Sequence, residues 1–324
     1  MRQPPILCGL LALAFCAHAR PSDSQTDSSD VQTAAAYHLS VAVDEVILTF
    51  HAADARGLPV NDLKPGELGL LDNGKPPQKI LAFDSVQDVP LRAGILMDIS
   101  ESMDQTRSTS RAIALQYARQ LLRRQTDQAF VINFDRRPTL AQTWTTSPYA
   151  LADGIRNLNV KTNGRPRNGG TAVFDAVYHA CHDQFAQFAS IDHAASGNFI
   201  LLFSDGEDNA SDTDLKTAVD ICQRTNTAIF AFHSEAHPGL SATGPAILAA
   251  LTSQTGGRVF RDDDSAAEID ADLRTIEADL RNQYRLIYKP ADLRRDGSFH
   301  RIQLTPPPRV DTVTIRSGYY APAH

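Results

Sequence analysis

Short apolar runs alternate with helix-like segments between residues 91 and 282, and this alternation constrains the fold more than any other feature of the chain. Such runs are typical of strands that are covered on both faces, and strands that alternate with helices predict a doubly wound, mostly parallel sheet. We therefore predict an α/β, Rossmann-like fold for this segment. The expected strands are 93–97, 128–134, 140–145, 198–206, 228–232 and 257–260, and the expected helices are 104–124, 148–158, 172–188, 213–224, 245–253 and 265–282.

A short polar motif, Asp98-Ile99-Ser100-Glu101-Ser102, follows the first expected strand. In this motif one carboxylate and two hydroxyls, those of Asp98, Ser100 and Ser102, alternate just before a helix begins. Hard oxygen ligands of this kind suit divalent cations such as Mg²⁺, and ligands of α/β sheets bind at the carboxyl ends of the strands. The motif predicts a cation site, although serine and aspartate are also common at helix N-termini.

Two later positions supply the oxygen ligands that the motif lacks. Thr171 follows Gly169-Gly170 at the start of a helix, and Asp205 ends the strand expected at 198–206. The motif, the threonine and the aspartate, each in a matching strand–loop–helix context, resemble the metal-ion-dependent adhesion site of von Willebrand factor A domains, over about residues 91–282. The metal ligands that this resemblance implies are Asp98, Ser100, Ser102, Thr171 and Asp205.

The resemblance implies a protein-binding or adhesion module rather than an enzyme. In that family the serines and the threonine bind Mg²⁺ directly, with Mn²⁺ or Ca²⁺ as alternatives, and the aspartates act mostly through water. One coordination position stays open for an Asp or Glu of a protein partner. Glu101 departs from the small residue usual at its position, so it either affects the cation or an acidic ligand, or points to solvent.

Two alternative functions are less consistent with the residues. A metal-dependent hydrolase or phosphatase-like enzyme could use Asp98 as a nucleophile, but haloacid-dehalogenase-like enzymes carry a second aspartate where this chain has Ser100. Neither Ser100 nor Ser102 lies in a Gly-x-Ser-x-Gly nucleophile elbow. A structural envelope module with a non-functional metal site is the other alternative, and Glu101 keeps it open.

The segments on either side of the α/β region are rich in strand-forming residues. Residues 37–90 and 283–324 together predict a discontinuous, β-sandwich-like module into which the domain 91–282 is inserted. Asn73-Gly74 and Asp296-Gly297 each predict the turn of a hairpin. These segments also resemble those of a von Willebrand A-related family that is abundant in acidobacteria.

The N-terminus predicts export. Residues 1–19 combine a positive residue, an apolar core and an Ala17-His18-Ala19 cleavage site, as in a secretory signal peptide. Lipid attachment at Cys16 is a minor alternative, because Phe15 is bulkier than the residue usual before a lipidated cysteine. Residues 20–36, rich in Ser, Asp, Gln and Thr, read as a disordered linker. The expected location is therefore periplasmic or extracellular.

Charge and hydropathy narrow the range of partners. The 324 residues include 31 Lys and Arg and 38 Asp and Glu, for a net charge of -7, without a basic stripe. This balance argues against nucleic acid as the main partner. Beyond the signal peptide, no stretch reaches the roughly 20 apolar residues that span a bilayer.

Cys181 and Cys222 are the cysteines that remain after removal of residues 1–19, and both fall on apolar faces of expected helices. An oxidising compartment would allow them to pair. We favour two buried thiols, because neighbouring helix axes lie about 8–10 Å apart, which often leaves Cα atoms too distant for a disulfide. His179 and His182 lie too close to Cys181 along one helix for the three to converge on one zinc ion.

Overall fold

The computed structural model describes residues 45–122, 124–158, 169–189, 197–234 and 243–322. Val43–His324 forms one compact unit, and the description below concerns that unit alone. The predicted signal peptide, the linker and residues 37–44 of the predicted β-rich segment lie outside the described residues. The division of the unit into an inserted domain and a flanking module, at residues 90 and 283, stays a prediction.

A six-stranded sheet forms the centre of the α/β region, in the order β6-β5-β4-β7-β8-β9. Its strands are parallel except for the antiparallel pair β5 and β6. The predicted doubly wound, mostly parallel sheet is confirmed. The strands are β4 (Leu91–Asp98), β5 (Gln128–Phe134), β6 (Pro138–Thr145), β7 (Gly197–Ser204), β8 (Thr227–His233) and β9 (Val259–Arg261).

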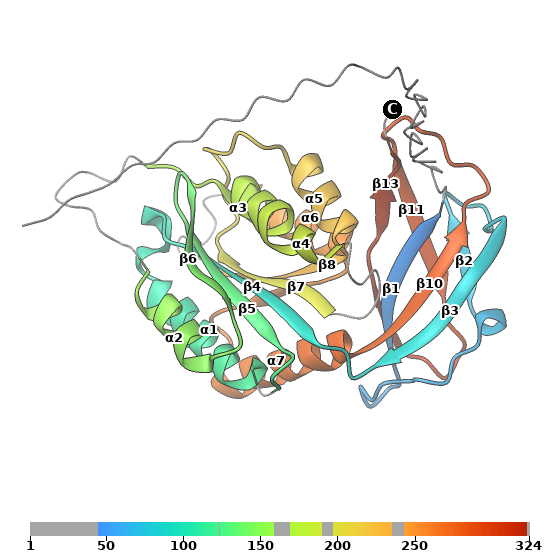
Figure 1. Cartoon of the computed structure of the whole chain (residues 1–324), viewed down its shortest axis with the longest axis horizontal. Coiled ribbons are helices and arrows are strands. Elements are labelled where there is room, and N and C mark those ends of the chain that lie inside the picture. Colours follow the sequence, from blue (N-terminus) through green and yellow to red (C-terminus); the bar gives the residue numbers. More distant parts are fainter. Residues whose placement is uncertain (1–44, 123, 159–168, 190–196, 235–242, 323–324) are drawn as a thin grey trace, which may run out of the picture. The chain divides into compact units, whose positions relative to one another are not determined.

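Helices cover both faces of this sheet, as Figure 1 shows. One face packs against α1 (Arg107–Leu121), α2 (Pro148–Arg156) and α7 (Ala266–Arg281), and the other against α3 (Val173–His179), α4 (Ala186–Ala189), α5 (Leu215–Arg224) and α6 (Thr243–Thr255). The helix expected at 172–188 is interrupted by a π-helical segment, Ala180–Phe185. The helix expected at 104–124 is preceded by a separate 3₁₀ turn, Glu101–Asp104.

Two antiparallel sheets face each other across a second core, and strands from both ends of the chain contribute to each. One sheet has the order β12-β1-β10-β3 and the other β13-β11-β2. The predicted sandwich-like module, built from discontinuous segments, is confirmed as part of the fold. Its elements are β1 (Val46–Ala53), a 3₁₀ turn (Pro65–Glu67), β2 (Gly69–Asp72), β3 (Lys79–Gln87), β10 (Asn282–Lys289), β11 (Phe299–Thr305), β12 (Thr312–Ile315) and β13 (Gly318–Tyr320).

The turn predicted at Asn73-Gly74 forms, with one antiparallel bridge between Asp72 and Lys75, but the strands on either side of each predicted hairpin turn do not pair with each other. The Asn73-Gly74 turn is tight, with φ of 48° and 76°, but β2 pairs with β11 and β3 pairs with β10. Pro76-Pro77 follow this turn, and prolines lack the N–H groups that would continue a ladder. The chain therefore crosses to the other sheet. Asp296-Gly297 likewise joins β10 and β11, which lie in different sheets.

A disulfide joins Cys181 and Cys222, so the preference for two thiols is also wrong. The two Cα atoms lie 5.1 Å apart, well within the range for a disulfide. Both cysteines belong to the buried cluster on this face of the sheet. Because Cα atoms lie about 2.3 Å from a helix axis, residues that face each other directly come within disulfide range even at an ordinary spacing of the axes.

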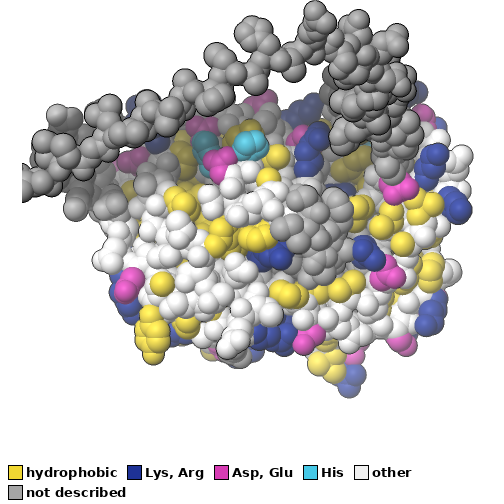
Figure 2. Space-filling view, viewed as in Figure 1, with side chains coloured by type: hydrophobic (Ala, Val, Ile, Leu, Met, Phe, Trp, Pro, Cys, Tyr) yellow, Lys and Arg dark blue, Asp and Glu magenta, His cyan; other side chains and the backbone are white. Residues whose placement is uncertain are grey.

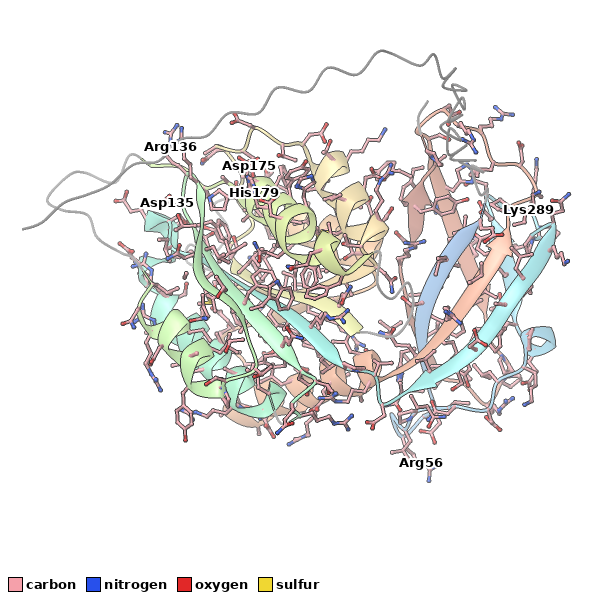
Figure 3. All side chains as sticks on the ribbon, viewed as in Figure 1. Arg56, Asp135, Arg136, Asp175, His179 and Lys289 are labelled. Atoms are coloured by element: carbon pink, nitrogen blue, oxygen red, sulfur yellow. A yellow bond between two sulfur atoms is a disulfide. The ribbon has the colours of Figure 1, made fainter. Side chains whose placement is uncertain are left out.

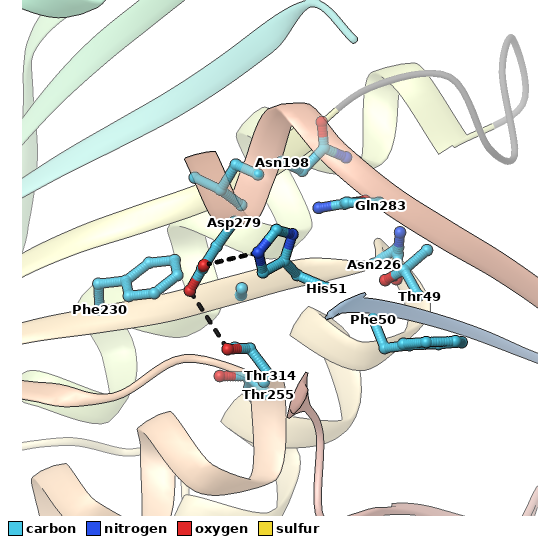
Figure 4. A pocket seen from close by; sticks show the side chains of 13 residues that line it. Thr49, Phe50, His51, Asn198, Asn226, Phe230, Thr255, Asp279, Gln283 and Thr314 are labelled. Carbon is cyan, nitrogen blue, oxygen red and sulfur yellow. Dashed lines mark hydrogen bonds and ion pairs between the residues drawn. The ribbon is translucent and has the colours of Figure 1, made fainter. Parts of the chain in front are cut away.

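A small polar cavity of about 30 Å³ lies between the sandwich and the α/β region (Figure 4). His51 Nε2 lies 3.4 Å from the Asp279 carboxylate, and Thr314 donates a 3.2 Å hydrogen bond to the same group. His51 Nδ1 also donates to the carbonyl of Asn282 at 2.6 Å. The size and the polar lining suit a single water molecule, so α7 meets β1 and β12 through buried polar contacts.

Candidate metal centre

Asp98 is the last residue of β4, one of the two central strands of the six-stranded sheet, and its side chain is buried, with the residue 1% exposed. Its carboxylate accepts hydrogen bonds from the Ser100 amide at 2.9 Å and from the Ser204 hydroxyl at 2.7 Å. Burial, with a smaller contribution from the negative charge of Asp205, raises the pKa of Asp98 to about 7 against the effect of these donors. A cation beside this carboxyl would favour its charged form.

The two serines of the motif lie beside this carboxylate. The hydroxyls of Ser100 and Ser102 are 3.1 Å apart, and Ser100 is buried while Ser102 is partly exposed. The 3₁₀ turn that begins after Ser100 holds them in place, because Met103 is fully buried and its amide donates to the Ser100 carbonyl at 3.2 Å. Local chain geometry thus brings the three motif oxygens together.

Thr171 and Asp205 belong to the same edge of the sheet. The Thr171 amide donates to the Asn209 side chain at 2.8 Å, and the Asn209 amide donates back to the Thr171 carbonyl at 3.0 Å. Asp205 follows Ser204, the residue that donates to Asp98. The adjacent Ala172 amide donates to the Asp135 carbonyl at 2.8 Å. The loops after β5 and β7 and the segment that leads into α3 are thereby tied together.

These residues fit a divalent cation. The negative charge of Asp205 contributes to the raised pKa of Asp98, and hydroxyls stand close to Asp98 on the same edge. Carboxylate and hydroxyl oxygens are ligands that Mg²⁺ accepts. Within the described ranges, no three His, Cys, Asp or Glu side chains converge to hold a metal. A metal at this edge would therefore depend on the hydroxyls.

The family of the α/β region follows from a sequence comparison. Residues 94–207, which include all five proposed ligands, match the family model of the von Willebrand factor type A domain. The chain contains a von Willebrand factor type A domain. The narrower resemblance of the flanking segments to a family abundant in acidobacteria stays a prediction. No curated protein matches the chain.

Several solved structures are similar to the chain. The conserved hypothetical protein BatB from Bacteroides thetaiotaomicron has a TM-score of 0.45 and 14% identity, covering 58% of this chain and 97% of that one. The vWF domain of the type V pili tip protein Mfa5 from Porphyromonas gingivalis gives 0.46 and 11%, covering 59% and 96%. Proximal thread matrix protein 1 from the mussel byssus, with a zinc-occupied MIDAS motif, gives 0.47 and 14%, covering 65% of this chain and about half of that one, 50%.

Sequence reasoning missed three residues that organise the edge of the A domain. Ser204 donates to Asp98, and Asn209 fixes the backbone of Thr171. Arg107 Nη2 donates to the carbonyls of Ile99 and Ser100 at 3.1 and 3.0 Å, and it also pairs with Asp104. Only Ser204 carried a signal, because it directly precedes the predicted ligand Asp205.

The acidic residues at the rim of the A domain divide into two kinds. Glu101 is exposed, which agrees with the interpretation that its side chain points to solvent. Glu207 accepts a 3.2 Å hydrogen bond from the Gly244 amide, and Asp208 accepts 2.9 and 2.6 Å bonds from the Phe174 amide and the Ser211 hydroxyl. Glu207 and Asp208 therefore hold loops in place.

Other charged groups also lie near this edge. Asp135 and Arg136 occupy the β5–β6 turn, and Asp175 and His179 lie on α3, as labelled in Figure 3. Arg136 donates to the Gly169 carbonyl at 3.3 Å. On the face shown in Figure 2, acidic and basic side chains are interspersed rather than gathered by sign.

The cluster of His179, Cys181 and His182 does not form a metal site. Both histidines contact Asp183 through Nδ1, at 2.6 Å each, and Cys181 is in the disulfide. The prediction that these three side chains do not converge on one ion agrees with this arrangement. None of the helices in the described ranges is long and apolar enough to cross a membrane.

Proposed function

We propose that this protein is an exported interaction or adhesion module that binds a protein partner through a divalent cation at the edge of its A domain. One observation carries the proposal. Asp98 is a buried carboxyl beside two hydroxyls and near a second carboxylate, all at the carboxyl edge of the parallel sheet. A cation there would neutralise charge that burial otherwise disfavours.

The proposed roles of the side chains follow from their chemistry. Ser100, Ser102 and Thr171 would bind Mg²⁺, or Mn²⁺ or Ca²⁺, through neutral hydroxyls, and Asp98 and Asp205 would act mostly through water. Neutral ligands leave the cation electrophilic, so the bound ion can accept an Asp or Glu carboxylate from the partner. This role requires no turnover, and we propose that the protein is not an enzyme.

Export is part of the same proposal. The disulfide between Cys181 and Cys222 supports it, because structural disulfides persist mainly in oxidising compartments. The signal-peptide pattern of residues 1–19 supports it independently. We propose a periplasmic or extracellular location.

A pull-down from the native envelope tests the proposal. Immobilised protein should capture a partner in Mg²⁺ but not in EDTA, and Asp98→Ala should capture none in either buffer. Asp135→Ala is the matched control, because Asp135 is an exposed carboxylate of the same edge that is not a proposed ligand. Capture that is identical with and without Mg²⁺ would contradict the proposal. So would hydrolysis of nitrophenyl esters or phosphoesters that is lost in Ser100→Ala.

Arg107→Ala should weaken Mg²⁺ binding about tenfold, a common effect of removing a residue that orients metal ligands. Arg107 holds the carbonyls of Ile99 and Ser100, so its loss frees the loop that carries the hydroxyls. Calorimetric titration with Mg²⁺ measures the change, and Arg119→Ala, an exposed arginine of the same helix, serves as the control. Equal Mg²⁺ affinity for both variants would show that Arg107 has no role in positioning.

A further inference from the structure

A pocket of about 230 Å³ opens where α5 approaches the start of β1 and the segment after β12. None of the proposed metal ligands lines it, so it is a feature separate from the metal centre. The lining residues used below are Val46, Ile47, Arg224, Leu293, Arg316 and Tyr320.

Arg316 gives this pocket a positive charge. Its Nη2 donates to the Ile47 carbonyl at 2.7 Å, and its Nη1 lies 3.4 Å from the Gln223 carbonyl. Its Nε is buried without a hydrogen-bond partner, and no carboxylate in the described part of the chain forms an ion pair with it. Burial lowers the pKa of Arg316 to about 10, which leaves it charged at neutral pH. The guanidinium has five N–H groups, and two of them donate to the Ile47 and Gln223 carbonyls. The remaining N–H groups can donate hydrogen bonds to a bound anion.

The rest of the pocket selects the kind of anion. Val46, Ile47 and Leu293 provide aliphatic surface, and the ring of Tyr320 provides an aromatic wall. An apolar lining with one placed charge is typical of sites for small organic ligands. The volume is below the usual range for drug-sized molecules, so the ligand must be compact.

The mouth of the pocket argues against highly charged ligands. Arg224 adds a second positive group, but it pairs with Asp220 at 2.8 Å, and Glu45 is exposed nearby. Two carboxylates at the mouth repel a dianion such as a phosphate monoester more strongly than a singly charged group. A single carboxylate bound to Arg316 meets less repulsion.

We propose that this pocket binds a compact organic monocarboxylate, with its carboxylate on Arg316 and its apolar body against Leu293 and Tyr320. A charge-assisted hydrogen bond between guanidinium and carboxylate is among the stronger polar contacts in proteins. The site goes beyond the proposed adhesion function, since it uses none of the same residues.

Phenylacetate is the probe for the test, and phenylacetamide, its uncharged analogue, is the control ligand. Titrations of the full chain in EDTA, followed by ligand-observed NMR, should show phenylacetate binding about tenfold or more tightly than phenylacetamide, the size expected for hydrogen bonds to a charged group. Arg316→Met should remove this preference. Equal affinities for the two compounds, or no binding of either, would overturn the proposal.

A second variant keeps the test decisive if Arg316→Met fails to fold. Arg224→Glu reverses an exposed charge at the mouth and should weaken phenylacetate binding severalfold. Arg56→Glu, an equivalent change on the exposed surface of the sandwich (Figure 3), should leave binding unchanged. Undiminished binding to Arg224→Glu would overturn the proposal. Asp98→Ala should bind phenylacetate normally, which separates this site from the metal centre.

Discussion

Asp127→Ala is expected to lower the free energy of unfolding by about 3–5 kcal/mol, the usual cost of breaking a buried ion pair by removing one partner. Asp127 is 0% exposed. It accepts hydrogen bonds from Arg281 at 2.8 and 3.3 Å and from the Leu91 amide at 2.9 Å. Arg281 also donates to the Val89 carbonyl at 3.1 Å. The variant removes the buried one of the two carboxylates that pair with Arg281, leaving only Glu277 at 3.0 Å, and it deprives the Leu91 amide of its acceptor.

The Asp127–Arg281 ion pair connects segments that are far apart in the chain, so its loss tests how strongly these segments stabilise each other. It lies where the chain enters the central sheet at Leu91 and where α7 ends at Arg281, directly before β10. Urea unfolding at neutral pH measures the loss. Asp84→Ala, which breaks an exposed pair with Arg285, is the control and should cost less than about 1 kcal/mol. Equal losses for the two variants would contradict the role assigned to Asp127.

Removing the disulfide is expected to cost about 2–4 kcal/mol, because the bond restricts the unfolded chain. Cys181 and Cys222 are separated by 41 positions, and both are fully buried. Protein that is reduced in urea and refolded with reductant should therefore melt at a lower temperature than oxidised protein. The Cys181→Ala/Cys222→Ala variant controls for the reductant itself, since its melting temperature should not respond. Identical melting of oxidised and reduced protein would show that the bond does not stabilise the fold.

Local patterns predicted the central sheet well. The strand expected at 128–134 has the observed bounds of β5, and the apolar run 93–97 lies within β4. Continuous apolar runs are informative because both faces of a parallel sheet are covered by helices. The two hairpins failed for a physical reason. A turn sequence fixes the turn, but strand partners depend on contacts far apart in the chain, such as β2 with β11.

The candidate site shows the same division between local and distant information. The motif oxygens of Asp98, Ser100 and Ser102 are neighbours in sequence, so their proximity could be predicted. The hydrogen bonds from Ser204 to Asp98 and from the Thr171 amide to Asn209 join segments more than 30 residues apart, and the local pattern marks Ser204 only as the neighbour of Asp205. The disulfide was missed because the distance between two Cα atoms depends on whether the two residues face each other directly, and the apolar pattern of each helix does not give that.

Titration calorimetry with Mg²⁺ tests the central claim most directly, using the wild type, Asp98→Ala and Asp135→Ala at neutral pH. The account predicts one saturable site in the wild type and in Asp135→Ala, and none in Asp98→Ala. Each binding-competent protein should also be stabilised by about 2.7 kcal/mol at a Mg²⁺ concentration 100 times its dissociation constant. Saturable binding of equal affinity in Asp98→Ala, or no binding by the wild type, would contradict a metal centre at this edge.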